Sequence, residues 1–221
     1  MTDLAKMLRF YVIPDLTSGR GLSLVEQAKA ALEGGATTIQ LRCKDATSKE
    51  LYEYALAFRR LADEYEALFI VNDRLDVALA ANADGVHLGT EDLPIKVARK
   101  IAPEGFIIGA TARTPQRAVE AQEAGANYLG VGAMFPTRTK KDTVIIGIEG
   151  LKKIKASVSI PCVAIGGITL KDVKEVMEAG ACGVAVSSAI FGAESPKERA
   201  KFFKVELENM NGRSHARINH L

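Results

Sequence analysis

The sequence has few of the features that mark nucleic-acid-binding or membrane proteins. Aromatic residues make up 6% of its 221 residues, tryptophan is absent, and the formal net charge is only +2. Nucleic acids are bound through stacking aromatic side chains and a positive field, so we expect no nucleic-acid partner. No apolar run approaches the roughly 18 residues that span a membrane, so we expect no membrane partner either.

Cysteine is also scarce. The three cysteines, Cys43, Cys162 and Cys182, are odd in number, far apart, and located in or beside apolar runs. They match no metal-binding spacing, so we interpret them as reduced, buried thiols. The first ten residues lack the long apolar core of a signal peptide, and we therefore expect a cytoplasmic protein.

Apolar runs rich in valine and isoleucine alternate with amphipathic stretches along the whole chain. Eight of these runs are predicted to be strands: 10–14, 37–41, 68–71, 85–88, 106–110, 128–131, 161–165 and 183–186. Helical patterns follow them at 24–32, 48–65, 74–81, 93–101, 115–123, 149–156, 170–178 and 196–208. Strands that are apolar on both faces belong to parallel sheets covered by helices. Eight strand–helix units therefore predict a closed (β/α)8 barrel, a TIM barrel.

A short repeat supports this architecture. Segments 33–37, 81–85, 123–127 and 178–182 each close a helix and open an even-numbered strand, and three of them carry glycine where a left-handed helix cap is expected. An open, doubly wound sheet is the alternative, but no Gly-x-Gly-x-x-Gly turn follows the first strand. Residues 1–208 are predicted to form one catalytic domain, and the polar residues 209–221 a disordered tail.

In such a barrel the chemistry lies at the carboxyl ends of the strands. Asp73 and Asp92 follow neighbouring strands there and are candidate ligands for Mg²⁺, which takes one or two carboxylates and completes its shell with water and phosphate oxygens. Helix capping explains both aspartates equally well, because each precedes a helical pattern. Three polar residues alternate from the end of the second strand onward and can face the same side: Gln40, Arg42 and Lys44.

The loop after the sixth strand, residues 130–141, combines hydroxyl groups with cations. Gly130 and Gly132 allow a turn or a close approach of the backbone. Five polar residues follow: Thr137, Arg138, Thr139, Lys140 and Lys141. Such groups on a tight loop can hold a phosphate, and the alternative is a solvated basic loop.

A second phosphate site is predicted from the last two strand ends. Gly166 and Gly167 expose backbone N–H groups, and Ser187 and Ser188 add hydroxyls. A tight turn and a helix cap are the alternatives. His87 lies near the end of the fourth strand, and a packing role for it is favoured over a catalytic one. Because the pattern offers no nucleophile paired with a base, we expect catalysis by stabilisation of a leaving anion.

Six motifs in one register, over residues 9–204, resemble the thiamine-phosphate synthase (thiamine-phosphate pyrophosphorylase) family. They are Gln40-Leu-Arg-x-Lys44, Val71-Asn-Asp73, Gly85-Val-His-Leu-Gly89 with Asp92, Gly132-x-x-Phe-x-Thr-x-Thr-Lys140, Ala164-Ile-Gly-Gly-Ile168 and Gly183-Val-Ala-Val-x-Ser-Ala-Ile190. The resemblance implies a (β/α)8 barrel that uses Mg²⁺. It also implies a transferase that joins a hydroxymethylpyrimidine diphosphate to a thiazole phosphate, or its carboxylate form, and releases pyrophosphate and thiamine phosphate.

The resemblance also implies a role for each matching position, with one Mg²⁺ per site. The pyrimidine diphosphate would be held by Gln40, Arg42, Lys44, Asn72, Thr111 and Lys140, among which Arg42, Lys44 and Lys140 are the implied catalytic residues. The thiazole phosphate would be held by Thr137, Thr139, Gly167, Ser187 and Ser188, and Mg²⁺ by Asp73 and Asp92. The implied mechanism is dissociative: pyrophosphate leaves, the pyrimidine methylene becomes cationic, and the thiazole nitrogen attacks it.

Two single positions and one segment depart from the family pattern. Thr111 stands where the family commonly has serine, Thr90 replaces a frequent glutamine, and segment 142–146 lacks the usual prolines. Two other activities remain open. A thiazole tautomerase on the same barrel would need an acid–base residue, for which only His87 is available, and a phosphate sensor would not need the aspartate pair. The expected partners are small phosphorylated molecules, and a homo-oligomer is compatible with the sequence.

Overall fold

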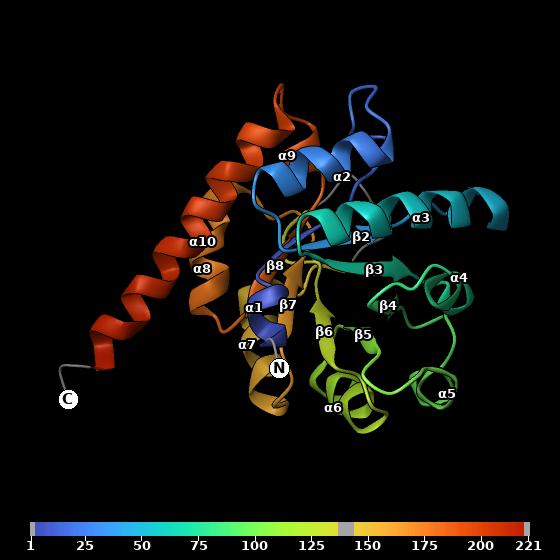
Figure 1. The fold of residues 1–221 in the computed structure, drawn as a ribbon. Helices are drawn as coiled ribbons and strands as arrows, with labels where there is room; N and C mark the ends of the chain where they lie inside the picture. Colours follow the sequence, from blue (N-terminus) through green and yellow to red (C-terminus); the bar gives the residue numbers. More distant parts are fainter. Residues whose placement is uncertain (1–2, 137–143, 219–221) are drawn as a thin grey trace.

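In the computed structural model, eight parallel strands close into a barrel surrounded by helices (Figure 1). The structure describes residues 3–136 and 144–218, with the backbone alone for 211–218. The strands are β1 (Phe10–Val12), β2 (Thr38–Leu41), β3 (Leu68–Asn72), β4 (Gly85–Leu88), β5 (Ile107–Ala112), β6 (Tyr128–Val131), β7 (Cys162–Ile165) and β8 (Gly183–Val186). Each pairs with the next in sequence, and β8 pairs with β1, so the (β/α)8 prediction is confirmed and the open sheet is wrong.

The helices cover the outside of the barrel. They are α1 (Leu4–Met7), α2 (Leu24–Glu33), α3 (Ser48–Glu64), α4 (Leu75–Ala80), α5 (Ile95–Ile101), α6 (Pro115–Glu123), α7 (Gly147–Ser157), α8 (Val173–Glu178), α9 (Ser188–Phe191) and α10 (Pro196–Ile218). A 3₁₀ turn, Leu170–Asp172, leads into α8. The short helices α1 and α9 were not predicted, because four residues carry no periodic pattern. No helix within residues 3–136 and 144–218 has both the length and the apolar character needed to cross a bilayer.

The repeat before the even-numbered strands has a structural explanation. At three of the four sites a side-chain oxygen accepts the backbone N–H of the preceding odd-numbered strand: Thr37 from Phe10 (3.1 Å), Asp84 from Phe69 (2.7 Å) and Asn127 from Ile108 (2.8 Å). The same three residues donate their own N–H to the carbonyl of the same partner. At the fourth site Cys182 makes only the backbone bond, to Cys162. The repeat therefore fixes the register between strand pairs at the amino-terminal end of the barrel.

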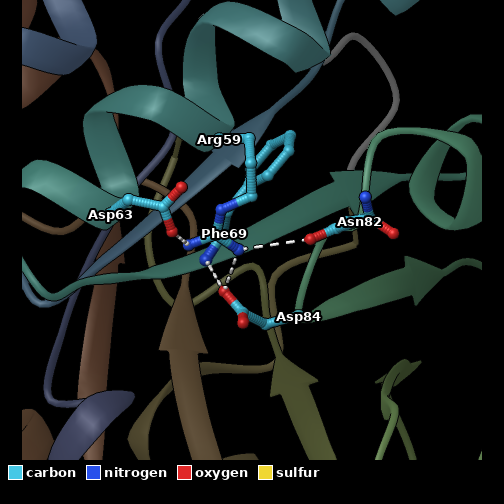
Figure 2. Close-up of polar contacts among 5 residues, drawn as sticks. All are labelled: Arg59, Asp63, Phe69, Asn82 and Asp84. Carbon is cyan, nitrogen blue, oxygen red and sulfur yellow. Dashed lines mark hydrogen bonds and ion pairs between the residues drawn. The ribbon is translucent and has the colours of Figure 1, made fainter.

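One of these sites is extended into an ionic cluster, shown in Figure 2. Arg59, on α3, lies 2.9 Å from the Asp84 carboxylate and 2.8 Å from that of Asp63, and donates to the carbonyl of Asn82 at 3.3 Å. Its guanidinium carbon lies 5.9 Å from the centre of the Phe69 ring. The cluster lies where β3 and β4 begin, at the amino-terminal end of the barrel. In this fold that end contributes to stability and not to catalysis.

The carboxyl-terminal helix is longer than predicted. Its predicted end at residue 208 is wrong, since the backbone of α10 stays helical to Ile218 and its last turns extend beyond the barrel (Figure 1). Residues 209–218 contain no proline, so nothing in them forces the helix to end. The first half is anchored to the barrel, where Phe203 stacks on Phe10 with ring centres 6.0 Å apart.

The three cysteines are free thiols. Cys162 is buried, whereas Cys43 and Cys182 are only half-buried, so the prediction of buried thiols holds fully for one of them. Burial raises the pKa of Cys162 to about 11 and that of Cys182 to about 12. Both thiols therefore stay protonated at neutral pH and are poor nucleophiles.

Candidate active site

A cavity of about 300 Å³ opens at the carboxyl ends of the strands. Ten of the predicted site residues line it: Gln40, Arg42, Lys44, Asn72, Asp73, Asp92, Thr111, Gly167, Ser187 and Ser188. Thr137, Thr139 and Lys140, with Arg138 and Lys141, lie outside the described residues. Because barrel closure brings all strand ends together, residues from 40 to 188 share this one cavity.

The two aspartates do not cap helices. The residues that precede α4 and α5, Arg74 and Pro94, make no side-chain capping bond, and neither Asp73 nor Asp92 is the capping residue. Asp92 accepts the backbone N–H of Gly89 at 2.7 Å through one carboxylate oxygen. Asp73 has a left-handed backbone, with φ 67°, a conformation that costs free energy for a residue other than glycine and is often found at functional sites. The capping explanation is therefore wrong for both aspartates.

The carboxylates of Asp73 and Asp92 lie close enough to interact directly. Burial, and then the hydrogen bond and negative charge of Asp92, raise the pKa of Asp73, while Lys44 and Arg42 act in the opposite direction. The Lys44 ammonium lies 3.7 Å from the Asp73 carboxylate. A cation between two repelling carboxylates would lower the free energy of the site.

The Asp73–Asp92 pair fits Mg²⁺ better than a metal whose ligands all come from protein side chains. Across residues 3–136 and 144–218, no group of three or more histidine, cysteine, aspartate or glutamate side chains is arranged to hold a metal. Structural and catalytic zinc sites use three or four such ligands, whereas Mg²⁺ is often bound by one or two carboxylates with water and substrate phosphate. Asp73 and Asp92 supply that smaller set.

Across the cavity, a buried hydroxyl is left without a partner. The Oγ of Ser187 is buried, and no described residue forms a hydrogen bond with it. Ser187 precedes α9 but makes no side-chain capping bond, so the helix-cap explanation is wrong for it. A buried hydroxyl without a partner is costly, and a bound anion would satisfy it.

The two glycines after β7 are needed for packing. At Gly167, with φ +69°, a Cβ would lie 2.5 Å from the carbonyl oxygen of Pro136, and at Gly166 one would lie 2.7 Å from the Cβ of Ala133. The loop after β6 is held there by a bond from the Phe135 N–H to the Gly166 carbonyl at 3.0 Å. The tight-turn explanation therefore accounts for both glycines, through their positive φ angles and their close packing against the loop after β6.

The floor of the cavity holds a hydrogen-bonded chain that sequence reasoning missed. Gln40 Nε2 donates to the hydroxyl of Tyr11 at 2.7 Å, and that hydroxyl lies 3.0 Å from the hydroxyl of Tyr128. Tyr128 is 3.1 Å from Nδ1 of His87, whose Nε2 is 3.0 Å from the hydroxyl of Thr111. Both nitrogens of His87 are thus engaged, as its predicted packing role requires.

Glycines within the strands were the available signal for this chain. At Gly109 a Cβ would lie 2.2 Å from the ring of Tyr128, and at Gly130 it would lie 2.8 Å from the ring of His87. Glycine inside a strand often marks the close approach of another group. The close approach predicted at Gly130 and Gly132 is confirmed, since a Cβ at Gly132 would lie 2.0 Å from the Ile165 carbonyl.

Four further polar residues line the cavity: Asp15, Thr90, Glu91 and Arg113. Asp15 organises its own loop by accepting the backbone N–H groups of Thr17 and Ser18, each at 3.0 Å. Although burial alone would raise the pKa of Asp15, the hydrogen bonds from Thr17 and Ser18 lower it. Asp15 is therefore a stable carboxylate with a structural function.

Comparisons with known proteins agree with this arrangement. The sequence profile of the thiamine monophosphate synthase family matches residues 10–190. The chain is 53% identical over 205 residues to a thiamine-phosphate synthase of Pyrococcus abyssi, covering 93% of this chain and 97% of that protein. It is 50% identical over 199 residues to one of Coprothermobacter proteolyticus, covering 90% and 94%.

Solved structures give the same result. The thiamine phosphate pyrophosphorylase of Pyrococcus furiosus superposes with a TM-score of 0.87 at 48% identity, covering 94% of this chain and 98% of that one. A 3-hexulose-6-phosphate synthase superposes with a TM-score of 0.66 at 18% identity, which indicates a shared fold alone.

Proposed function

The chain belongs to the thiamine monophosphate synthase family and is a transferase of that family, and we propose that its cavity joins a pyrimidine diphosphate to a thiazole phosphate. The products are thiamine phosphate and pyrophosphate. The observation that carries this proposal is the Asp73–Asp92 carboxylate pair, with Lys44 and Arg42 beside it in the same cavity. Carboxylates for a metal and cations for oxygen anions together suit a diphosphate leaving group.

We assign Asp73 and Asp92 as the residues that would hold one Mg²⁺ ion. When bound, the ion supplies positive charge to the diphosphate oxygens as the bond to the leaving group breaks. Lys44 would share this task, and the 3.7 Å distance from its ammonium to the Asp73 carboxylate supports this role. Arg42 adds a second fixed charge whose planar guanidinium can bind two phosphate oxygens at once.

The protein side of the reaction is mainly positioning and charge stabilisation. Gln40, Asn72 and Thr111 would orient the pyrimidine, while Arg42 and Lys44 stabilise the negative charge that develops on the departing pyrophosphate. Lys140 is proposed to join them on the basis of the sequence. The thiazole nitrogen then attacks the cationic methylene carbon, a step that requires no nucleophilic side chain.

The thiazole phosphate is proposed to bind at the ends of β7 and β8. The buried Ser187 hydroxyl supports this assignment, because an incoming phosphate oxygen would give it a partner that the described residues do not. Ser188, at the start of α9, and the backbone of Gly167 would complete this side. Thr137 and Thr139 are added to the phosphate site from their sequence positions.

The tautomerase alternative is disfavoured by the surroundings of His87. An acid–base histidine needs a nitrogen free to exchange a proton with the substrate, but Nδ1 lies 3.1 Å from Tyr128 and Nε2 lies 3.0 Å from Thr111. A sensor would not need the carboxylate pair, in which burial, and then the hydrogen bond and negative charge of Asp92, raise the pKa of Asp73.

The test is incubation with both phosphorylated substrates, with and without Mg²⁺, followed by assay of thiamine phosphate and pyrophosphate. We expect equimolar products that depend on Mg²⁺. Binding of both substrates without turnover at any Mg²⁺ concentration would support the sensor instead. Conversion of a thiazole alone, without the pyrimidine substrate, would support the tautomerase.

A further inference from the structure

We propose that the buried chain Gln40–Tyr11–Tyr128–His87–Thr111 sets the hydrogen-bonding polarity of the cavity floor and makes Tyr11 and Tyr128 positioning residues for the aminopyrimidine ring. The inference deepens the proposed function and rests on it for the identity of the ring. The hydrogen-bonded chain itself is present in the protein without any substrate.

The hydrogen-bonded chain crosses the interior of the barrel. It links β2, β1, β6, β4 and β5 in that order, although Tyr11 and Tyr128 are 117 residues apart in sequence. Both tyrosines are only 1% exposed. A hydroxyl buried to that degree must be hydrogen-bonded to avoid a desolvation cost, so neither tyrosine can leave the chain freely.

The direction of the bonds follows from proton counting. Tyr11 accepts a proton from the Gln40 amide, so its own single proton points to Tyr128. Tyr128 then donates to Nδ1 of His87, which must be unprotonated, and the proton of His87 lies on Nε2 and points to Thr111. Burial raises the pKa of both tyrosines, so each keeps the proton that this order requires.

The two ends of the chain therefore have opposite character toward the cavity. Because the Gln40 amide nitrogen is used by Tyr11, its carbonyl oxygen is the group that can offer an acceptor to a ligand, while Thr111 accepts from His87 and keeps its own proton to donate. An aminopyrimidine presents the matching groups, since its amine donates and its ring nitrogens accept. Reversing one end would require every bond in the chain to reverse.

The first experiment measures the histidine in the free enzyme. Nitrogen-15 NMR of His87 at neutral pH should show the neutral ring with its proton on Nε2. A proton on Nδ1, or a charged ring, would overturn the proposed direction. This readout needs no substrate, so it is independent of the proposed reaction.

The second experiment is a double-mutant cycle on substrate affinity. Tyr128→Phe and Thr111→Val should each raise KM for the pyrimidine diphosphate about tenfold, as expected for the loss of about one hydrogen bond. Because both break the same chain, the double variant should be no more than a few times worse than either single one. KM for the thiazole phosphate should stay unchanged.

Control variants distinguish the loss of the hydrogen-bonded chain from general damage to the fold. Tyr52→Phe removes a phenol hydroxyl from an exposed tyrosine on α3 and should leave both KM values unchanged. Tyr11→Phe breaks the chain at another point and replaces Tyr128→Phe in the cycle if that variant does not fold. Multiplying effects in the cycle, or equal changes in both KM values, would overturn the proposal. A wild-type enzyme that binds the pyrimidine diphosphate but makes no thiamine phosphate would instead refute the proposed function.

Discussion

Replacing Asp73 with asparagine removes one of the two carboxylates of the proposed Mg²⁺ site and keeps the size of the side chain. The Asp73 side chain is 26% exposed, and burial together with Asp92 raises the pKa of its carboxylate. Its ion pair with Lys44, which is 58% exposed, contributes little to stability. Removing the charge should therefore stabilise the metal-free protein and weaken its response to Mg²⁺.

The pH dependence of this effect has a definite sign. Between the ordinary pKa of 3.8 and the raised pKa in the folded protein, the native state binds more protons at Asp73 than the unfolded state does. The stability of the metal-free wild type therefore falls as the pH rises through this window, and the full cost is present above the raised pKa. Asp73→Asn should be the more stable protein at neutral pH, and the difference should disappear as the pH falls toward 3.8.

The magnitude of the Mg²⁺ response follows from linkage. A ligand present at 100 times its Kd stabilises the native state by about 2.7 kcal/mol. For a chain of this length 1 kcal/mol changes Tm by about 2–4 °C, so the wild-type Tm should rise by about 5–11 °C. Asp73→Asn should lose most of this shift, because one carboxylate holds Mg²⁺ much more weakly than two.

The assay is scanning calorimetry over a Mg²⁺ titration, with and without pyrophosphate to complete the metal's shell. Asp76→Asn is the matched control, because its carboxylate is exposed on α4 and paired with Arg74. That variant should keep the wild-type shift. The metal assignment fails if Asp73→Asn responds to Mg²⁺ like the wild type, or if the wild type does not respond even with pyrophosphate present.

Three further predictions test other parts of the molecule. Ser187→Ala should leave Tm unchanged or slightly raised, because the Ser187 hydroxyl has no described partner in the free protein. It should increase KM for the thiazole phosphate about 10-fold or more in steady-state kinetics. An unchanged KM would exclude Ser187 from the phosphate site. Lys140→Ala should lower kcat by about 10²–10³ in single-turnover measurements while Lys141→Ala changes it little, and the reverse order would refute the assignment. Asp84→Ala should lower the free energy of unfolding in urea by about 2–3 kcal/mol, because the Phe69 N–H and Arg59 lose their partner. Asp63→Ala, which removes the exposed partner of Arg59, should lower it by less than about 1 kcal/mol. Equal losses would contradict this account.

The sequence by itself determined the architecture, because each strand–helix unit carries its own periodic pattern. The strands β4, β6 and β8 have the predicted boundaries, and all eight predicted strands are present. Local capping signals were similarly readable. Ser23 caps α2 and Thr47 caps α3, each directly before the start of a predicted helix (24–32 and 48–65), and in both the hydroxyl accepts the backbone N–H three residues later.

The location of the site also followed from the sequence. Once eight parallel strands are predicted to close, polar residues at their carboxyl ends must converge at one end of the barrel, and Gln40, Asp73 and Ser187 do line a common cavity there. The roles proposed for these residues remain predictions of the resemblance and of their chemistry.

Only the tertiary structure decided which of two local explanations applies to a residue, and which distant residues meet. Asp92 was equally suited to capping a helix and to binding a metal. The cap is excluded because Pro94, and not Asp92, precedes α5, and because the Asp92 carboxylate accepts the Gly89 N–H instead. The Tyr11–Tyr128 hydrogen bond joins β1 to β6 across the barrel, and no local pattern encodes a pairing over that distance. Periodicity records which face of an element is buried, whereas the partner it meets there depends on how all eight strands close.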